Sequence, residues 1–216
     1  MNEDTKLFIE ELKSRPDVLG IIMFGSWARG DNRPDSDVDL VVILTEGYRR
    51  TVEYKNQQAF EIIYTTPKGA LDFWQSKKDD CVSLWTVAKI MYEKDGTIQK
   101  LKEWAGKIIK EGKKPIDEYQ KDQFKFSVED EIKAVKILIG KDEATANLVL
   151  TYTINNLTVL FFDLRQLWTP APKQRLAKIR EIKPETYSLF EGYYKSHLII
   201  ERLEIAKQIV PAVFEI

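Results

Sequence analysis

Two continuous apolar runs near the N-terminus, Val18–Phe24 and Val38–Leu44, flank a polar segment rich in Gly and Asp. Apolar runs of this length that contain β-branched residues are typical of buried strands. A third segment, Ala59–Thr65, places a single acid, Glu61, among β-forming residues. The other elements expected here are a helix over residues 1–15, a helix opened by Pro67, a strand over 88–92 and a helix capped by Thr97. This alternation of helices and strands predicts an α/β or α+β core.

From Lys113 onward the pattern changes, because no further segment resembles a strand. Helices are expected over residues 116–139, 144–168, 173–182, 185–194 and 197–209. The second of these is apolar on nearly all sides, which is typical of a helix at the centre of a bundle. Gly, Lys and Pro cluster over Glu111–Pro115, where we place a domain boundary. We therefore expect an α+β protein: a small mixed sheet with flanking helices over 1–112, followed by a bundle of four or five helices over 113–216.

The polar segment between the first two strands carries residues that suit phosphate and metal chemistry. Gly25 lets the chain turn tightly, and Ser26 adds a hydroxyl beside the turn. If a helix begins there, its first backbone amides form a phosphate-binding pocket. Asp37 and Asp39 follow, and residues two apart on an extended chain point to the same face. Two such carboxylates beside bound phosphate suit Mg²⁺, and Glu61 on the next strand would complete a cluster able to hold two metal ions.

This combination resembles the signature of the polymerase-β-type nucleotidyltransferase superfamily. The resemblance is carried by the Gly-Ser turn at Gly25, the Arg-Gly pair at Arg29 and the sequence Asp-Ser-Asp-Val-Asp-Leu over residues 35–40. It implies that the Gly-Ser turn holds a nucleoside triphosphate and that Asp37 and Asp39 bind two divalent metal ions. It also implies that a third acid, here Glu61, orients or deprotonates the attacking hydroxyl. With its helical second half, the chain is similar to small-molecule adenylyltransferases of the aminoglycoside and lincosamide types.

Two further charged residues have alternative roles. Arg29 is expected to contact either a phosphate of the nucleotide or an acid of its own domain. Glu131 falls inside the apolar stripe of the helix over 116–139. It is either buried against a polar partner, Asn155 or Asn156, or faces the space between the domains, where it would act as a catalytic base. We expect the structural role.

Composition excludes several classes of protein and of site. The chain has 33 Lys and Arg residues and 34 Asp and Glu residues, so its formal net charge is −1. A chain without excess positive charge is not expected to bind long nucleic acid. Cys81 and His197 are the sole residues of their types, so no intrachain disulfide and no site of several Cys or His ligands can form. No apolar run approaches a membrane span, and the N-terminus lacks a signal-peptide pattern. We therefore expect a cytoplasmic protein without a membrane partner, and we leave a homodimer open.

Together these residues predict an enzyme that uses Mg²⁺, with two ions per site. It would transfer a nucleoside monophosphate, AMP from ATP in the first instance, to a hydroxyl of a small molecule such as an antibiotic, and release pyrophosphate. The alternative is an antitoxin-like protein of the same fold that modifies or binds a partner protein. The intact pair Asp37 and Asp39 favours catalysis.

Overall fold

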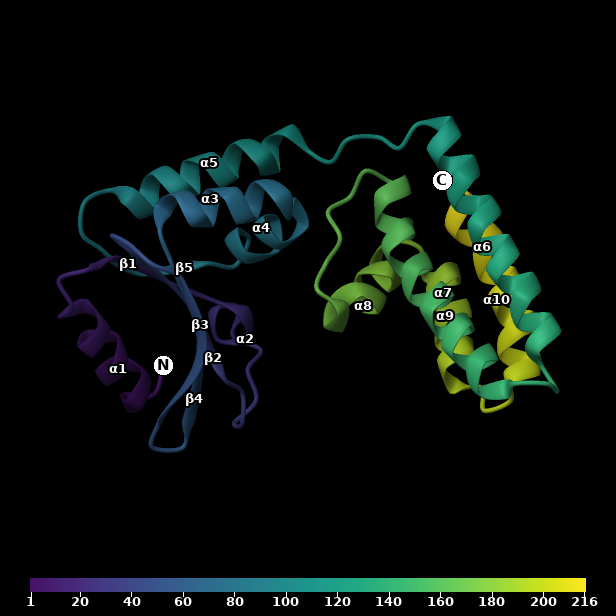
Figure 1. Ribbon diagram of the computed structural model, residues 1–216, viewed down its shortest axis with the longest axis horizontal. Coiled ribbons are helices and arrows are strands. Elements are labelled where there is room, and N and C mark those ends of the chain that lie inside the picture. Colours follow the sequence, from purple (N-terminus) through teal and green to yellow (C-terminus); the bar gives the residue numbers. More distant parts are fainter. The chain divides into compact units, whose positions relative to one another are not determined.

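A five-stranded mixed sheet lies in the first half of the computed structural model, which describes residues 1–216 (Figure 1). Its strands are β1 (Val18–Phe24), β2 (Val38–Leu44), β3 (Arg49–Lys55), β4 (Gln58–Thr65) and β5 (Lys89–Glu93). They are ordered β3-β4-β2-β1-β5; β2 and β4 run parallel, and the other neighbouring pairs are antiparallel. The predicted α+β class is confirmed, and the first two strands have the predicted bounds.

No sequence pattern predicts β3. None of its residues is fully buried, and its sequence, Arg-Arg-Thr-Val-Glu-Tyr-Lys, carries charges on both faces. The strand lies at the edge of the sheet and forms a hairpin with β4. Charged side chains are common on edge strands, where they disfavour pairing with other chains. Backbone pairing with β4, rather than burial of side chains, therefore defines this element.

Helices cover both faces of the sheet. They are α1 (Glu3–Lys13), α2 (Gly25–Arg29), α3 (Pro67–Ser76), α4 (Lys78–Trp85) and α5 (Thr97–Glu111). α1 buries Phe8 and Leu12 against one face. α5 packs against β1 and β5, and its Ile98 lies against Gly20 of β1. α5 begins at Thr97, so Thr97 is its first residue rather than its cap. The Thr97 amide donates a hydrogen bond to the Asp95 side chain at 3.1 Å.

Side chains alternate between the two faces along each strand, and this alternation places the acids. Leu40 of β2 belongs to the core cluster that includes α1, so the preceding Asp39 points to the opposite face. Phe60 and Ile62 of β4 belong to the same cluster, so Glu61 between them also points away from α1. A shift of one residue in either strand would move an acid into the core, so burial of these neighbours fixes the register.

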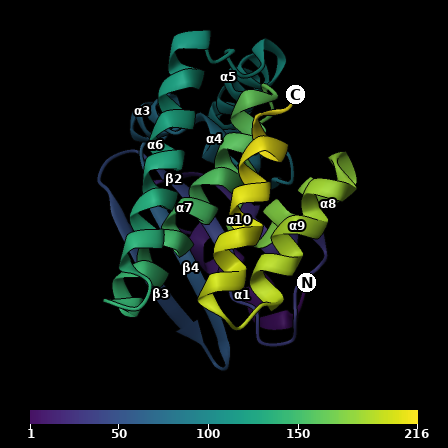
Figure 2. The ribbon, with the colours of Figure 1, turned by 90° about the vertical axis from the view of Figure 1, so that its right-hand side faces the viewer.

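A helical bundle forms the second half. The chain divides into two compact units, Met1–Glu111 and Gly112–Ile216. The second unit consists of α6 (Glu118–Leu138), α7 (Glu143–Leu164), α8 (Pro172–Ile182), α9 (Pro184–Lys195) and α10 (Ile199–Phe214). α6 packs on α7, and α10 packs on α6, α7 and α9, as Figure 2 shows. Leu150, Leu157 and Phe161 of α7 are fully buried in its core, so the predicted helical second half is confirmed.

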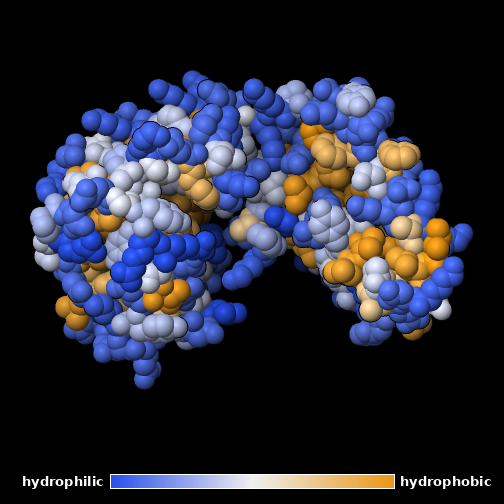
Figure 3. Space-filling model, viewed as in Figure 1, coloured by the Kyte–Doolittle hydropathy of each residue, from blue (hydrophilic) through white to orange (hydrophobic).

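The bundle also exposes apolar side chains (Figure 3). Phe124, which the helical repeat places on the buried stripe of α6, is 41% exposed, whereas Val128 and Val135 on that stripe are buried. The composition of α7 predicts that neighbouring helices cover it on all sides. Leu148 of α7 is 71% exposed, so one side of this helix is not covered. None of the helices combines the length and the apolar character that crossing a membrane would require.

Candidate active site

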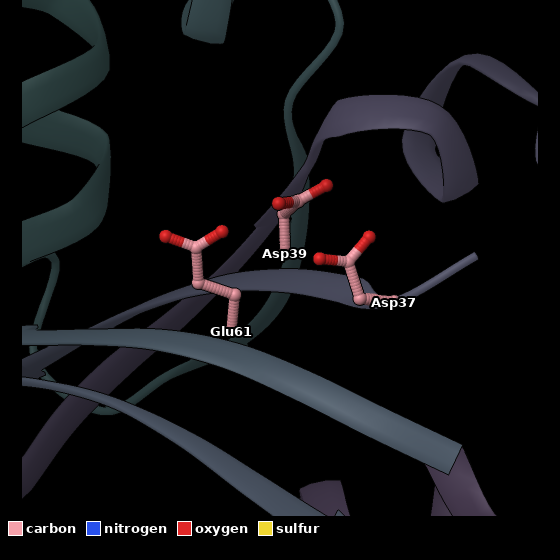
Figure 4. A group of neighbouring side chains, drawn as sticks. All are labelled: Asp37, Asp39 and Glu61. Atoms are coloured by element: carbon pink, nitrogen blue, oxygen red, sulfur yellow. The ribbon is translucent and has the colours of Figure 1, made fainter.

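Three carboxylates meet where β2 and β4 run side by side (Figure 4). Asp39 on β2 lies opposite Glu61 on β4, and Asp37 is the residue just before β2. One carboxylate oxygen from each residue lies within 4.8 Å of the other two. Asp39 and Glu61 are partly buried, whereas Asp37 is exposed. The structure thus brings together the three acids that the sequence singles out.

The donor set fits a divalent cation. Mg²⁺ prefers oxygen ligands at about 2.1 Å, so two oxygens on one octahedral ion lie at most about 4.2 Å apart. The three oxygens, all within 4.8 Å of one another, lie close to that range. Three neighbouring carboxylates also repel one another, so a cation between them would relieve this repulsion.

The acidic cluster itself requires a glycine at the end of β1. Phe24, the last residue of β1, pairs with Asp39, so the chain leaves the strand beside that carboxylate. Gly25 has a φ of +67°, and a Cβ added there would lie 1.8 Å from Asp39 Oδ2. A residue without a side chain is therefore needed for the backbone to pass so close to the acid.

Two side chains hold the backbone immediately before Asp37. The Ser36 carbonyl accepts a hydrogen bond from the Trp27 indole at 3.2 Å and another from the Gln58 side-chain amide at 2.9 Å. Gln58 in turn accepts a hydrogen bond from the Asn2 side chain at 3.0 Å. Sequence reasoning missed both contacts to Ser36, because a bond to a backbone carbonyl produces no motif. They fix the segment from which Asp37 projects.

Comparison with protein families identifies the part of the chain that contains this cluster. Residues 5–103 match the family model of the nucleotidyltransferase domain. This part of the chain is a nucleotidyltransferase domain. The resemblance that rests on the Gly-Ser turn and the paired acids is thereby confirmed for it.

Solved structures with a similar fold are also found. A nucleotidyltransferase-like protein from Exiguobacterium sibiricum 255-15 has a TM-score of 0.52 and 14% sequence identity, over 99% of this chain and 74% of its own. At that identity the likeness shows the fold alone. A spectinomycin adenyltransferase from Enterococcus faecialis, solved with ATP and spectinomycin, has a TM-score of 0.36 and 12% identity, over 99% of this chain and 88% of its own. No curated protein matches the chain.

Within the nucleotidyltransferase domain, the Gly-Ser turn opens a short helix. α2 spans five residues and ends at Gly30, which has a φ of +88° and donates its amide hydrogen to the Ser26 carbonyl at 2.8 Å. Ser26 is partly buried. The first amides of a helix have no acceptor within it. The backbone at Gly25 and Ser26 therefore has the form expected of a phosphate-binding turn, and this role stays a prediction.

Arg29, at the end of α2, pairs with an acid of its own domain. Arg29 Nε lies 3.1 Å from each carboxylate oxygen of Asp31. This guanidinium holds the pKa of the Asp31 carboxyl below its usual value. Of the two predicted contacts, the structure contains the one to the acid, and Arg29 would have to leave Asp31 to contact a phosphate.

Sequence reasoning missed Arg50, a cation beside the cluster. Arg50 Nε donates a hydrogen bond to Glu61 Oε1 at 2.8 Å, and Nη2 contacts the same oxygen. The hydrogen bond from Arg50 to Glu61 is the largest cause that raises the pKa of the guanidinium above its ordinary value. Arg50 lies on β3, a strand that the sequence analysis did not predict, so its position beside Glu61 could not be predicted either. Recognising Gln58–Thr65 as the second strand of a hairpin would have placed Arg50 on the first strand of that hairpin.

Glu131 lies in the helical unit, and its partner differs from those predicted. Thr153 Oγ1 of α7 donates a hydrogen bond to Glu131 Oε2 of α6 at 2.6 Å. Neither Asn155 nor Asn156 bonds to it, and the Asn155 side chain instead accepts a hydrogen bond from Arg175 at 3.4 Å. Thr153 is fully buried and Glu131 partly buried. The contact joins two helices of the bundle.

We expect Glu131→Gln to lower the melting temperature and to leave nucleotidyl transfer measurable. A hydrogen bond to an ionised group contributes about 1.5–3 kcal/mol, and Gln keeps a weaker, neutral version of it. Thermal unfolding of Glu131→Gln, Thr153→Val and the double variant measures the coupling between the two side chains. A catalytic base would show the reverse: an unchanged melting temperature and a loss of turnover of about 100-fold or more.

Proposed function

We propose that this protein is an enzyme that transfers a nucleoside monophosphate from a nucleoside triphosphate to a hydroxyl of a small molecule, with Mg²⁺ as cofactor. The observation that carries the proposal is the cluster of Asp37, Asp39 and Glu61, in which one carboxylate oxygen of each residue lies within 4.8 Å of the other two, in a nucleotidyltransferase domain. We take ATP as the donor and two metal ions per site.

In this proposal Asp37 and Asp39 hold the metal ions together with Glu61. When bound, the ions neutralise charge on the phosphates and stabilise the attacking and leaving oxygens. The backbone at Gly25 and Ser26 binds the triphosphate, because the first amides of α2 are donors without an acceptor inside the helix. Arg29 lies at the other end of α2 and supplies a positive charge near the triphosphate.

Glu61 orients the acceptor hydroxyl and takes its proton. The hydroxyl oxygen forms a bond to the α-phosphorus, the bond from that phosphorus to the bridging oxygen breaks, and pyrophosphate leaves. Such a reaction depends chiefly on positioning and electrostatic stabilisation, so a few well-placed residues suffice. The register that sets Asp39 opposite Glu61 supplies this positioning for two of the three acids.

Charge and cysteine content support the remaining parts of the proposal. A formal net charge of −1 suits a small acceptor better than long nucleic acid, because nucleic-acid binding rests on many cationic contacts. Cys81 is buried and free. A free thiol agrees with the reducing cytoplasm, which we propose as the location of the protein.

A labelling screen tests the function. The purified protein is incubated with Mg²⁺ and α-³²P-labelled ATP, GTP or CTP, and with aminoglycosides, lincosamides, tRNA or cell lysate as acceptors. We expect label on a small molecule, ATP as the best donor, and no transfer by Asp39→Asn. Label on a lysate protein alone would favour the antitoxin-like alternative, and label on tRNA alone would exclude a small-molecule acceptor.

A further inference from the structure

One member of the acidic cluster, Glu61, forms an ion pair with Arg50. Arg50 and Glu61 lie on neighbouring strands, and Val52, two residues from Arg50, pairs directly with Glu61. Arg50, Val52 and Glu61 therefore share the face of the sheet that carries Asp39. Both guanidinium contacts of Arg50 go to Glu61 Oε1. A carboxylate held in this way offers less of its charge to a metal ion.

We propose that Arg50 exchanges partners during the reaction: it neutralises Glu61 while the cluster holds no metal, and it contacts a phosphate of the nucleotide once a divalent cation has taken Glu61. The inference rests on the proposed function, since it assumes that the three acids bind a metal. It assigns a role to a residue that sequence analysis did not single out.

Competition follows from charge and position. A guanidinium and a divalent cation are both attracted to Glu61, and two cations beside one carboxylate oxygen repel each other. Asp39 also attracts the Arg50 guanidinium electrostatically, so Arg50 interacts with a second acid of the cluster besides Glu61. Its positive charge therefore opposes the entry of a metal ion.

Exposure makes the exchange feasible. The Arg50 side chain is 63% exposed and that of Glu61 is 27% exposed. An ion pair this exposed contributes little stability, so the arginine can leave its partner at low cost. The planar fork of a guanidinium that binds a carboxylate also fits phosphate oxygens. A triphosphate bound beside the cluster would bring such oxygens to the released Arg50.

Metal binding without nucleotide tests the first half of the exchange. Binding of Mn²⁺ to the full-length protein is measured from the loss of the electron paramagnetic resonance signal of free Mn²⁺. We expect Arg50→Gln to bind Mn²⁺ about fivefold more tightly than the wild type, as removal of one nearby charge predicts. Arg50→Lys keeps the charge and should stay close to the wild type.

Arg49→Gln is the matched control. Arg49 is the neighbouring residue on β3, carries the same charge and pairs with Tyr64, whose side chain belongs to the core cluster on the α1 side of the sheet. Its side chain donates a hydrogen bond to Thr51 Oγ1 at 3.3 Å. Losing a charge on this face should leave Mn²⁺ affinity almost unchanged, so the comparison separates a local effect from a change in net charge.

Nucleotide binding tests the second half. The affinity for a non-hydrolysable ATP analogue is measured by calorimetry at saturating Mn²⁺, and we expect it to fall about tenfold or more in Arg50→Gln, since an arginine–phosphate contact is lost. Opposite changes in the two affinities support the exchange. Unchanged or weaker Mn²⁺ binding by Arg50→Gln overturns the competition, and unchanged nucleotide affinity overturns the phosphate contact.

The same measurements separate this inference from the proposed function. If the wild type binds no Mn²⁺, or if Asp39→Asn binds it as well as the wild type, the metal site itself is refuted. If the wild type binds Mn²⁺ through Asp39 and Arg50→Gln behaves like the wild type, the exchange alone is refuted.

Discussion

Asp39→Asn is expected to abolish nucleotidyl transfer while the protein stays folded, and Asp37→Asn is expected to do the same. A nucleoside triphosphate carries nearly four negative charges, and metal ions remain beside it where carboxylates hold them. Asn has almost the size of Asp but no charge, so the shape of the site is kept and its attraction for cations is lost. Transfer is measured with labelled ATP, and folding by circular dichroism.

Ligand-induced stabilisation gives a second measurement of the same prediction. Mg²⁺ with a non-hydrolysable ATP analogue should raise the melting temperature of the wild type, because a ligand that binds the native state alone stabilises it. This shift should shrink strongly in Asp37→Asn and in Asp39→Asn.

Asp35→Asn is the matched control for both measurements. Asp35 belongs to the same acidic segment but forms an exposed pair with Arg33, at 3.2 Å from its Nε. It should keep full transfer and the full ligand-induced shift. Full Mg²⁺-dependent binding and transfer by Asp39→Asn would show that the assignment of the metal site is wrong.

The sequence predicted those parts of the site that are encoded within single segments. β1 and β2 are marked by continuous apolar runs, since their residues are buried on both faces of the sheet. Within such a run, the charge of Asp39 is costly unless a partner or a metal ion compensates it, and this cost made it a candidate. The spacing of Asp37 and Asp39 then followed from the geometry of an extended chain.

What the sequence did not predict depends on contacts between segments. Arg50 matters because a hairpin places it diagonally across from Glu61, and edge strands lack the apolar signal that marks buried ones. Glu131 was correctly placed inside the stripe of its helix, but a helical period does not determine which residue of α7 lies opposite, and Thr153 takes that position. Phe124 lies on the same stripe and stays exposed, because the period does not determine how far a neighbouring helix extends over it.

Gly25→Ala is the second substitution with a large expected effect. Its Cβ would lie 1.8 Å from Asp39 Oδ2, so the carboxylate and the backbone cannot both keep their positions. Asp39 is opposite Glu61, and a displacement of about 1 Å at a reacting group can lower the rate about 100-fold. We therefore expect a loss of transfer of at least about 100-fold and weaker binding of Mn²⁺, measured as for the Arg50 variants.

Gly30→Ala separates the two consequences of adding a Cβ. Gly25 is the first residue of α2 and Gly30 follows its last, with φ values of +67° and +88°, so alanine is strained at either position, at about 1–2 kcal/mol each. At Gly30, however, an added Cβ meets nothing within 4 Å. Gly25→Ala should therefore lose at least as much stability as Gly30→Ala in chemical denaturation, because it adds the overlap with Asp39 to the same strain. Gly25→Ala alone should lose metal affinity and transfer. Equal losses of transfer in the two variants would mean that strain in α2, and not the overlap with Asp39, disables the site. Full transfer by Gly25→Ala would show that the reaction does not need Asp39 in the position that the proposed mechanism assigns to it.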